Sequence, residues 1–305
     1  MAISRQQLTK ELEPGLNALF GLEYSRYDNQ HAEIYTTESS DRAFEEEVML
    51  SGFAGAPTKQ EGASVVFDQA NEAYTARYTH ETIALAFSIT EEAIEDNLYD
   101  RLAQRYTRAL ARSMSNTKQV KAAQVLNQAQ FTAVTGGDGV PLIANNHPLS
   151  NGGTFSNVLA TAADLNETSL EQALIDIQGF VDERGLKIAL NGRKMIIPKE
   201  LQFTAERLMK STLRTGTADN DINAINNMGM VPEGYRVNNF LTDTDSFFLL
   251  TDVPNGLKHF ERSPIKTALE GDFDTGNVRF KARERYSFGF SDPRCIFGNG
   301  NLPTS

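Results

Sequence analysis

The amino-acid sequence predicts an α+β fold in which a very long helix and a very long strand accompany a smaller mixed module. Residues 278–290 alternate between apolar and charged side chains, which is the period of a strand with one buried and one exposed face. Residues 90–130 repeat apolar side chains at four-residue spacing with no Gly or Pro, which predicts one helix. Between them, residues 161–262 alternate between helical and strand-like segments.

The composition is that of an ordinary globular chain, with 305 residues, 40% of them hydrophobic, and a formal net charge of −11. This acidic balance argues against a general affinity for nucleic acid, because phosphates would be repelled at long range. No apolar run approaches the ~18 residues of a membrane span, and the first residues lack the apolar core of a signal peptide. We therefore expect a chain that is made and assembled in the cytosol. Its one cysteine, Cys295, has no disulfide partner within the chain.

The first segment, residues 1–44, is short of core-forming residues and contains Pro14 and Gly15. It is polar and is followed by three consecutive carboxylates. These are Glu45, Glu46 and Glu47. The pattern predicts an N-terminal arm that lies on another surface.

Residues 45–89 predict two extended runs around a loose tip that contains Pro57 and Lys59. Between the runs, glycine and alanine replace the large apolar residues. A two-stranded hairpin with so little to bury is marginal on its own in water. We therefore expect something outside the hairpin to cover it, which is a first indication of oligomerisation.

The long helix is predicted to begin after Thr90, which caps it, and to reach about Gln130. At ~1.5 Å per residue it would be roughly 60 Å long. Its first turns are acidic and its later part is basic, an order that favours the helix dipole. The basic residues are Arg101, Arg105, Arg108, Arg112, Lys118 and Lys121.

The mixed module at residues 161–262 opens with a helix for which Thr168 and Glu171 predict a capping box. Short strands and a second helix follow. A polar loop, residues 213–229, separates this second helix from the later strands. Prominent polar side chains in the loop are those of Thr215, Asp219, Asn220 and Asp221.

No motif for catalysis, a cofactor or a metal stands out. The four histidines lie far apart, and no Cys or His follows at ligand spacing. The glycine-rich stretch at Gly136 lacks the Gly-Lys-Ser/Thr sequence of a phosphate-binding loop. We therefore expect a protein that is not an enzyme and that binds no cofactor.

The strand at residues 278–290 places its aromatic rings and its cations on opposite faces. The cations are Arg279, Lys281, Arg283 and Arg285, and the rings are those of Phe280, Tyr286, Phe288 and Phe290. Rings that stack on bases must share the exposed face with the cations. The parity therefore predicts that these rings belong to the core.

The cation row has three interpretations: ion pairs with acids, which we favour, contact with packaged nucleic acid, or a solvated face. The acids could come from the same domain or from a neighbouring copy, and Glu45, Glu46 and Glu47 are candidates. Glu284 lies on the apolar face, where an unpaired carboxylate is costly to bury. We therefore expect an arginine, Arg283 or Arg285, to pair with it.

With its parts in this order, the chain resembles the major capsid proteins of tailed bacteriophages, whose fold is shared with herpesvirus shells. It is most similar to the Mu-type prophage head subunit group. The segments that carry the resemblance are DGVPLIANNHPL, DERGLKIALNGRKMIIPKELQFTAERLMKS, GTADNDINA, EGDFDTGNVRFKARERYSFGFSDPR and IFGN. They cover most of the span from about Thr90 to Asn299, whereas the earlier residues match by architecture rather than by motif.

The resemblance implies a structural subunit that forms hexamers and pentamers of an icosahedral shell around double-stranded DNA. Its implied parts are an N-terminal arm (1–44), an extended hairpin or E-loop (45–89), a peripheral domain (90–160 and 263–305) and an axial domain (161–262). The loop that contains Asp221 would lie near the capsomer axis. A separate scaffold protein and a portal are implied as partners, with no membrane.

Two other functions are compatible with the sequence. An encapsulin-type compartment shell would have the same fold and would enclose an enzyme cargo. A nucleic-acid-binding module would use residues 278–290 to hold its target, with a steep dependence on salt.

Overall fold

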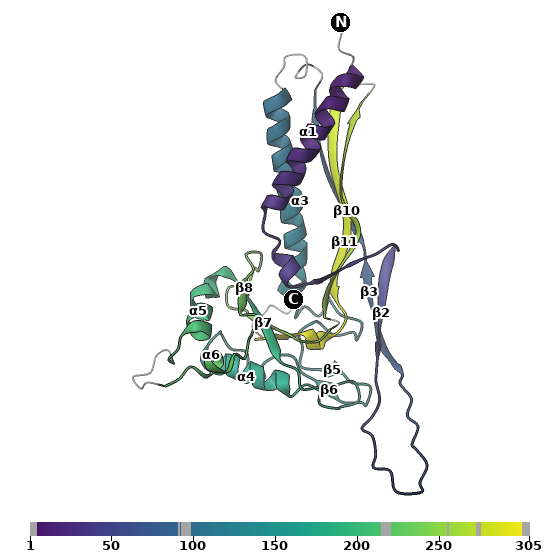
Figure 1. Ribbon diagram of the computed structural model, residues 1–305, viewed down its shortest axis with the longest axis vertical. Helices are drawn as coiled ribbons and strands as arrows, with labels where there is room; N and C mark the ends of the chain where they lie inside the picture. Colours follow the sequence, from purple (N-terminus) through teal and green to yellow (C-terminus); the bar gives the residue numbers. More distant parts are fainter. Residues whose placement is uncertain are drawn as a thin grey trace. The chain divides into compact units, whose positions relative to one another are not determined.

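The computed structural model describes residues 5–90, 99–214, 221–254, 256–272 and 276–300, together with Glu92 (Figure 1). For residues 5–13 and 99–102 it describes the backbone alone. The chain forms two compact units. The first comprises Met1–Glu45, Tyr78–Ala122 and His259–Phe288, and the second comprises Glu46–Arg77, Ala123–Lys258 and Gly289–Ser305.

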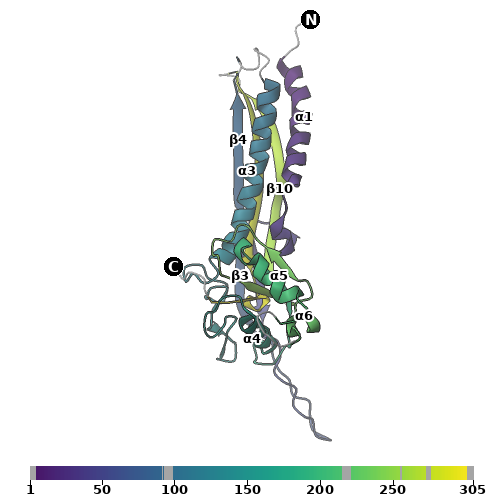
Figure 2. The same ribbon diagram turned by 90° about the vertical axis from the view of Figure 1, so that its left-hand side faces the viewer.

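The first unit contains the long elements, which run beside one another in Figures 1 and 2. They are α1 (Arg5–Arg26), β4 (Glu81–Ile89), α3 (Tyr99–Asn127), β10 (Leu257–Gly271) and β11 (Val278–Phe290). The short 3-10 helix η1 (Gln30–Glu33) and the short strand β1 (Thr36–Ser39) belong to the same unit. The strands form one sheet in the order β1-β10-β11-β4. β11 is antiparallel to β4, with Val278 opposite Ile89 and Tyr286 opposite Glu81.

β11 has the alternation that the sequence predicts. Phe280, Ala282 and Tyr286 are at most 1% exposed, whereas Arg279 and Arg283 are exposed. The buried face packs against both helices in one apolar cluster. That cluster contains Leu16, Phe20, Ile89, Ala103, Leu110, Ala111, Met114, Phe280 and Ala282. The prediction that the rings of this strand are core is confirmed for Phe280 and Tyr286.

The N-terminal segment contributes more to the core than its sequence indicates. Helix α1 continues through Pro14 and Gly15, although a proline inside a helix costs about 3 kcal/mol. Leu16 and Phe20 follow at four-residue spacing and are 3% and 2% exposed. Their burial against α3 and β11 offsets the cost of the proline. The arm therefore lies on its own unit over this stretch.

The second unit is a mixed module around a sheet in the order β12-β9-β7-β8. Its elements are β5 (His147–Pro148), β6 (Thr154–Phe155), α4 (Glu167–Gln178), β7 (Gly192–Ile197), η2 (Lys199–Leu201), α5 (Gln202–Lys210), α6 (Ala224–Met228), β8 (Tyr235–Val237), β9 (Phe248–Thr251), η3 (Pro293–Cys295) and β12 (Ile296–Gly298). β7 is parallel to β8 and antiparallel to β9. The apolar face of α4 packs on this sheet through Leu170, Leu174 and Ile177.

The capping prediction for α4 is wrong in its residues. Asn166, rather than Thr168, is the N-cap, and its side chain accepts a hydrogen bond from the backbone of Ser169. The Ser169 hydroxyl in turn lies 3.0 Å from the Asn166 backbone nitrogen. The box is therefore shifted two residues toward the N-terminus and uses a serine in place of Glu171.

The hairpin is formed by β2 (Phe44–Leu50) and β3 (Glu72–Thr79), which make a two-stranded sheet with no further strand among the described residues. Between them, residues 51–71 form an extended loop that is exposed almost throughout and includes Pro57 and Lys59. The Asp68 carboxylate closes the loop by accepting a hydrogen bond from Ala54 N at 2.7 Å. Arg184 Nη2 lies 2.9 Å from the other Asp68 oxygen, so the second run is also attached to the loop after α4.

The packing of β11 yields a first prediction. Replacing Phe280 with alanine removes a ring that lies 5.6 Å from Phe87 and 6.4 Å from Phe20. We expect the free energy of unfolding of the unassembled subunit, measured in urea by circular dichroism, to fall by about 3–5 kcal/mol. Arg283→Ala on the exposed face serves as the control and should change it by less than about 0.5 kcal/mol. Similar losses in both variants would contradict the assigned faces.

Candidate functional site

The exposed face of β11 carries the predicted row of cations, and two of them have partners in their own unit. Arg279 pairs with Asp272, and Lys281 Nζ lies 3.6 Å from a Glu270 carboxylate oxygen. Both cationic side chains are more than half exposed, so these pairs are weak. Arg283 is exposed and Arg285 is half-buried. Neither has a carboxylate within 4 Å among the described residues.

Glu284 lies on the buried face and is 1% exposed. Its Oε2 lies 3.6 Å from Lys118 Nζ of α3 and accepts a hydrogen bond of 3.2 Å from the Tyr24 hydroxyl of α1. Burial raises the pKa of Glu284, and Lys118 and Tyr24 oppose that shift by favouring the charged form. Burial, with Glu284 beside it, also raises the pKa of Tyr24.

The expectation of an arginine beside Glu284 is therefore wrong. Arg283 and Arg285 are its sequence neighbours, and neighbouring side chains in a strand point to opposite faces. A cation that pairs with Glu284 must approach from the buried side of the strand, against which α1 and α3 pack. Lys118 of α3 takes that position.

The three consecutive carboxylates have partners close by. The Ser40 hydroxyl donates to Glu45 at 2.6 Å. In the second unit, Glu46 lies 3.6 Å from Arg77 Nε. Glu47 pairs with Lys258 and accepts from the Ser291 hydroxyl. The three carboxylates thus have contacts other than the cation row of β11.

Of the loop residues singled out from the sequence, Thr215, Asp219 and Asn220 lie outside the described residues. Asp221 is exposed. Its carbonyl oxygen accepts a hydrogen bond of 2.9 Å from Arg214 N, and Leu213 bridges to Ile222. These contacts join the two ends of the loop.

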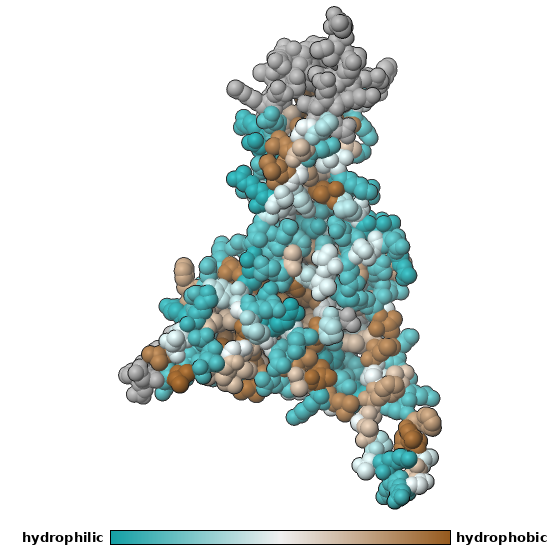
Figure 3. All heavy atoms as spheres, in the orientation of Figure 1, coloured by the Kyte–Doolittle hydropathy of each residue, from teal (hydrophilic) through white to brown (hydrophobic). Residues whose placement is uncertain are grey.

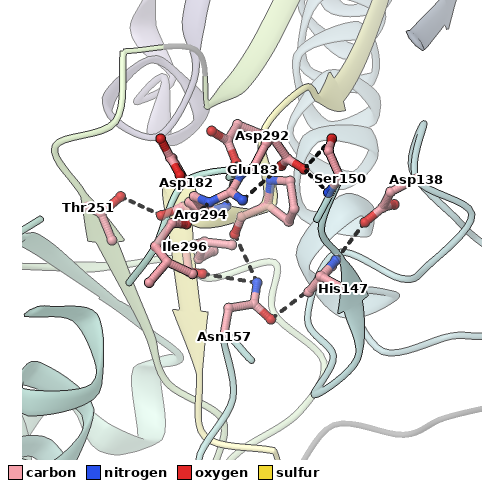
Figure 4. Close-up of polar contacts among 12 residues, drawn as sticks. Asp138, His147, Ser150, Asn157, Asp182, Glu183, Thr251, Asp292, Arg294 and Ile296 are labelled. Atoms are coloured by element: carbon pink, nitrogen blue, oxygen red, sulfur yellow. Dashed lines mark hydrogen bonds and ion pairs between the residues drawn. The ribbon is translucent and has the colours of Figure 1, made fainter. Parts of the chain in front are cut away.

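A buried polar cluster that the sequence did not single out lies in the second unit (Figure 4). Its centre is Arg294, which is 2% exposed. The guanidinium lies 2.8 Å from Glu183 and 3.2 Å from Asp292, and it donates to Val181 O at 2.6 Å. It also sits over the Phe155 ring, 4.4 Å from the centroid. Burial raises the pKa of Asp292, and the charge of Arg294 opposes this shift.

Asn157 extends the cluster to another part of the same unit. Its amide nitrogen lies within hydrogen-bond distance of three carbonyl oxygens, at 2.7, 2.9 and 3.2 Å. They belong to Leu142, Pro293 and Ile296. The ring of His147 lies 3.3 Å from the Asn157 carbonyl oxygen and 2.7 Å from the Asp138 carboxylate.

Three of the segments quoted for the family resemblance meet in this cluster. They supply Asp138 and His147, then Glu183, then Asp292 and Arg294. The charges satisfy one another, and within the described ranges no set of three acidic, His or Cys side chains could hold a metal. The cluster therefore ties segments together. The signal for it in the sequence was the charged triplets DER and DPR, whose partners local spacing does not reveal.

A histidine pair lies beside the Glu284 site in the first unit. The rings of His31 and His259 are 5.4 Å apart edge to face, and His259 stacks on Phe288 at 4.5 Å. Burial lowers the pKa of His31 to about 4 and that of His259 to about 3, and the charge of Lys118 adds to both shifts. Both rings are therefore neutral at pH 7.

The family model for phage capsid protein matches residues 73–299. No curated protein sequence matches the chain. Among solved structures, the virus-like particle from Pyrococcus furiosus is similar over 93% of this chain and 97% of that one, at 10% identity and a TM-score of 0.52.

Two further solved structures give comparable matches. The capsid of the native GTA particle is similar over 89% of this chain and 90% of that one, at 12% identity and a TM-score of 0.52. The structure named Mycobacterium phage Che8 is similar over 88% of this chain and 89% of that one, at 15% identity and a TM-score of 0.51. At such low sequence identity, these structural similarities show a shared fold and nothing further.

The fold is thus that of subunits that build capsid shells. The chain belongs to the phage capsid protein family, because the family model covers well over half of it. It is a structural capsid protein of the bacteriophage type and a component of the virion rather than an enzyme. Within the described part of the chain, no helix is long and apolar enough to cross a bilayer.

The alternatives are not favoured. Phe280 and Tyr286 are each 1% exposed, so they cannot stack on bases as a nucleic-acid-binding strand requires. The family that matches is that of phage capsid proteins, which does not favour a cargo compartment.

The Arg294 cluster yields a second prediction. Arg294→Met leaves Glu183 and Asp292 buried without their cation, and we expect the free energy of unfolding to fall by about 3–5 kcal/mol. The control is Arg193→Met, which breaks a pair with Glu233 whose arginine side chain is 56% exposed. It should cost less than about 1 kcal/mol. Chemical denaturation of the unassembled subunit measures both, and equal costs would refute a structural role for the cluster.

The histidine pair yields a third prediction, for acidic pH. The unfolded chain binds protons at these rings below about pH 6.5, whereas in the native state His31 stays neutral until about pH 4 and His259 until about pH 3. The stability that each ring contributes is therefore complete above pH 6.5 and falls by about 1.4 kcal/mol per pH unit from there down to the folded pKa of that ring.

The comparison variant is His259→Phe, which keeps a ring stacked on Phe288 and should flatten the pH dependence of unfolding between pH 6 and 4. Glu284, whose raised pKa acts in the opposite direction, is present in both proteins and cancels from the difference. Parallel pH profiles for the two proteins would show that His259 is not held neutral by the fold.

Proposed function

We propose that this capsid protein forms hexamers and pentamers around double-stranded DNA, and that its hairpin loop, residues 51–71, lies on a neighbouring subunit. The observation that carries this proposal is the apolar surface of the loop. Phe67 is 94% exposed, and Val66, Val65 and Phe53 are each more than 60% exposed. In Figure 3 the hairpin, at the lower right, carries hydrophobic residues in brown.

This apolar surface supports coverage by another copy on energetic grounds. Burying one large apolar side chain contributes about 1.5–3 kcal/mol. The loop has no sheet partner beyond its own base, so it has little of its own to bury. A neighbouring subunit would supply the missing contacts, and each copy would cover the next one around a closed ring.

The cation row supports a second contact between copies. Arg283 is exposed and lacks a carboxylate within 4 Å in the described ranges, while the chain as a whole carries a net charge of −11. A neighbouring acidic surface would therefore attract this row. Complementary charges of this kind set register and speed association more than they add affinity.

The same proposal includes the division of the chain into the parts of a capsid subunit. We take residues 1–44 as the arm, 45–89 as the E-loop, 90–160 with 263–305 as the peripheral domain, and 161–262 as the axial domain. The loop containing Asp221 would lie near the capsomer axis. A separate scaffold protein and a portal would assist assembly in the host cytoplasm, and the Mu-type head subunits would be the nearest relatives. The motifs from residues 138 to 299 support this grouping.

A single charge in the loop tests the proposal. Because Phe67 is 94% exposed, Phe67→Glu should leave the packing of the subunit intact, and the variant should fold with the melting temperature of the parent chain. We expect it to form few or no closed shells by negative-stain microscopy. The control is Gln60→Glu, which adds the same charge at an exposed position of the same loop and should assemble normally. Normal shells from Phe67→Glu would refute the proposed role of the loop.

A further inference from the structure

Two arginines of the long sheet, Arg262 of β10 and Arg285 of β11, are half-buried and have no anionic partner among the described residues. Neither guanidinium has a carboxylate within 4 Å, and both Nε atoms are buried without a hydrogen-bond acceptor. We propose that Arg262 and Arg285 form a site for a carboxylate side chain of a second copy of this chain. The inference rests on the proposed assembly of copies and adds to it the residues that receive the acid.

Both arginines lie on the face of the sheet that carries the cation row. β10 and β11 are neighbours in the sheet and run side by side in Figures 1 and 2. Along β10, Ile265 and Leu269 pack against the helix cluster, so the alternate residues, which include Arg262, point to the opposite face. Arg285 lies on that opposite face too, because its two neighbours in β11 are buried.

His80, next to β4, shows that the two guanidinium groups are close to one another. Its ring is buried, and its nitrogens lie 2.9 and 3.0 Å from two serine hydroxyls. Burial lowers the pKa of His80, and the charges of Arg285 and Arg262 add to this shift, whereas Glu45 opposes it. Both arginines therefore lie near the same neutral ring.

Two like charges that are half-buried near one another raise the energy of the isolated subunit. Burial removes part of the hydration of each guanidinium, and proximity adds repulsion. Glu45 offsets these costs only in part, because its carboxylate is more than 4 Å from both arginines and accepts a hydrogen bond of 2.6 Å from Ser40. An incoming carboxylate has two oxygens that can accept from both guanidinium groups, so it would relieve both costs.

The surface beside Arg285 leaves room for an incoming side chain. In β4 the residues opposite Arg285 and Arg283 are Thr82 and Ala84. Both are exposed, and both side chains are short. Directly opposite residues are the nearest neighbours on one face of an antiparallel pair. A segment of another copy can therefore approach the arginines from this side without displacing a large side chain.

A second copy is the occupant that the charges favour. The chain has 40 acidic against 29 basic residues, so another copy presents carboxylates in excess. The same balance repels DNA phosphates at long range. Complementary charges between copies also fix their relative orientation, which the closed rings of the proposed assembly require.

Self-association of the purified full chain, with no nucleic acid or other protein present, tests this inference. Sedimentation velocity at physiological salt compares the parent chain with Arg285→Gln and Arg262→Gln. We expect each substitution to weaken self-association about tenfold or more, because each removes charge-assisted hydrogen bonds to the carboxylate. The matched control is Lys266→Gln, which removes the same charge from an exposed position on the same face of β10. It should change self-association less than about twofold.

Urea unfolding separates an assembly site from a structural role. It is followed by circular dichroism at a concentration at which the parent chain is monomeric. Removing an unpaired, half-buried charge should leave the unfolding midpoint of Arg285→Gln unchanged or raise it, although the same variant associates less. A midpoint that falls in both arginine variants would show that the two side chains serve the fold, and would overturn the inference.

Three further results would also overturn it. If both arginine variants associate as the parent chain does, the site is refuted, while the role of the hairpin loop stands or falls separately with Phe67→Glu. If the parent chain does not associate at any concentration, the proposed assembly fails and this site fails with it. If Arg285→Gln loses affinity for a short DNA duplex but keeps its self-association, the arginines bind phosphate rather than a second copy.

Discussion

The contact between the buried face of β11 and the two helices α1 and α3 is the constraint on which the first unit depends. A strand this long can hide one face only against elements of similar length, and α1 and α3 provide them. The same contact contains a charge, because Glu284 interrupts the apolar side chains. Lys118 and Tyr24, one from each helix, both contact the same carboxylate oxygen, Oε2, whereas Oε1 has no hydrogen-bond partner among the described residues. The ion pair and the hydrogen bond form together only when both helices pack on this face of β11.

The second unit is also held together by buried polar side chains, which here join segments of irregular structure. Its sheet is small, and several of its segments have no regular structure. Arg294 joins them, because one guanidinium can satisfy Glu183, Asp292 and a backbone carbonyl together. Asn157 does the same for carbonyl groups. Buried polar side chains that each serve several acceptors can thus replace a larger apolar core where the chain is irregular.

The exposed surfaces of the chain differ in chemistry. The exposed face of β11 is cationic, whereas residues 51–71 of the hairpin loop carry exposed apolar side chains. An acidic subunit with local basic surfaces attracts its own copies in only a few orientations. A shell protein needs this property, since subunits must meet in the correct order before apolar contacts hold them.

The sequence by itself determined the local features. The alternation along residues 278–290 fixed which face of β11 is buried, and the four-residue spacing predicted α3, because both signals come from side chains close together in the chain. Only the tertiary structure decided that Lys118, rather than an arginine, meets Glu284, that Leu16 and Phe20 of the apparent arm belong to a core, and that Arg294 meets Glu183. These partners lie far apart in the sequence, and which of many similar charges or apolar groups come together depends on how whole helices and strands pack.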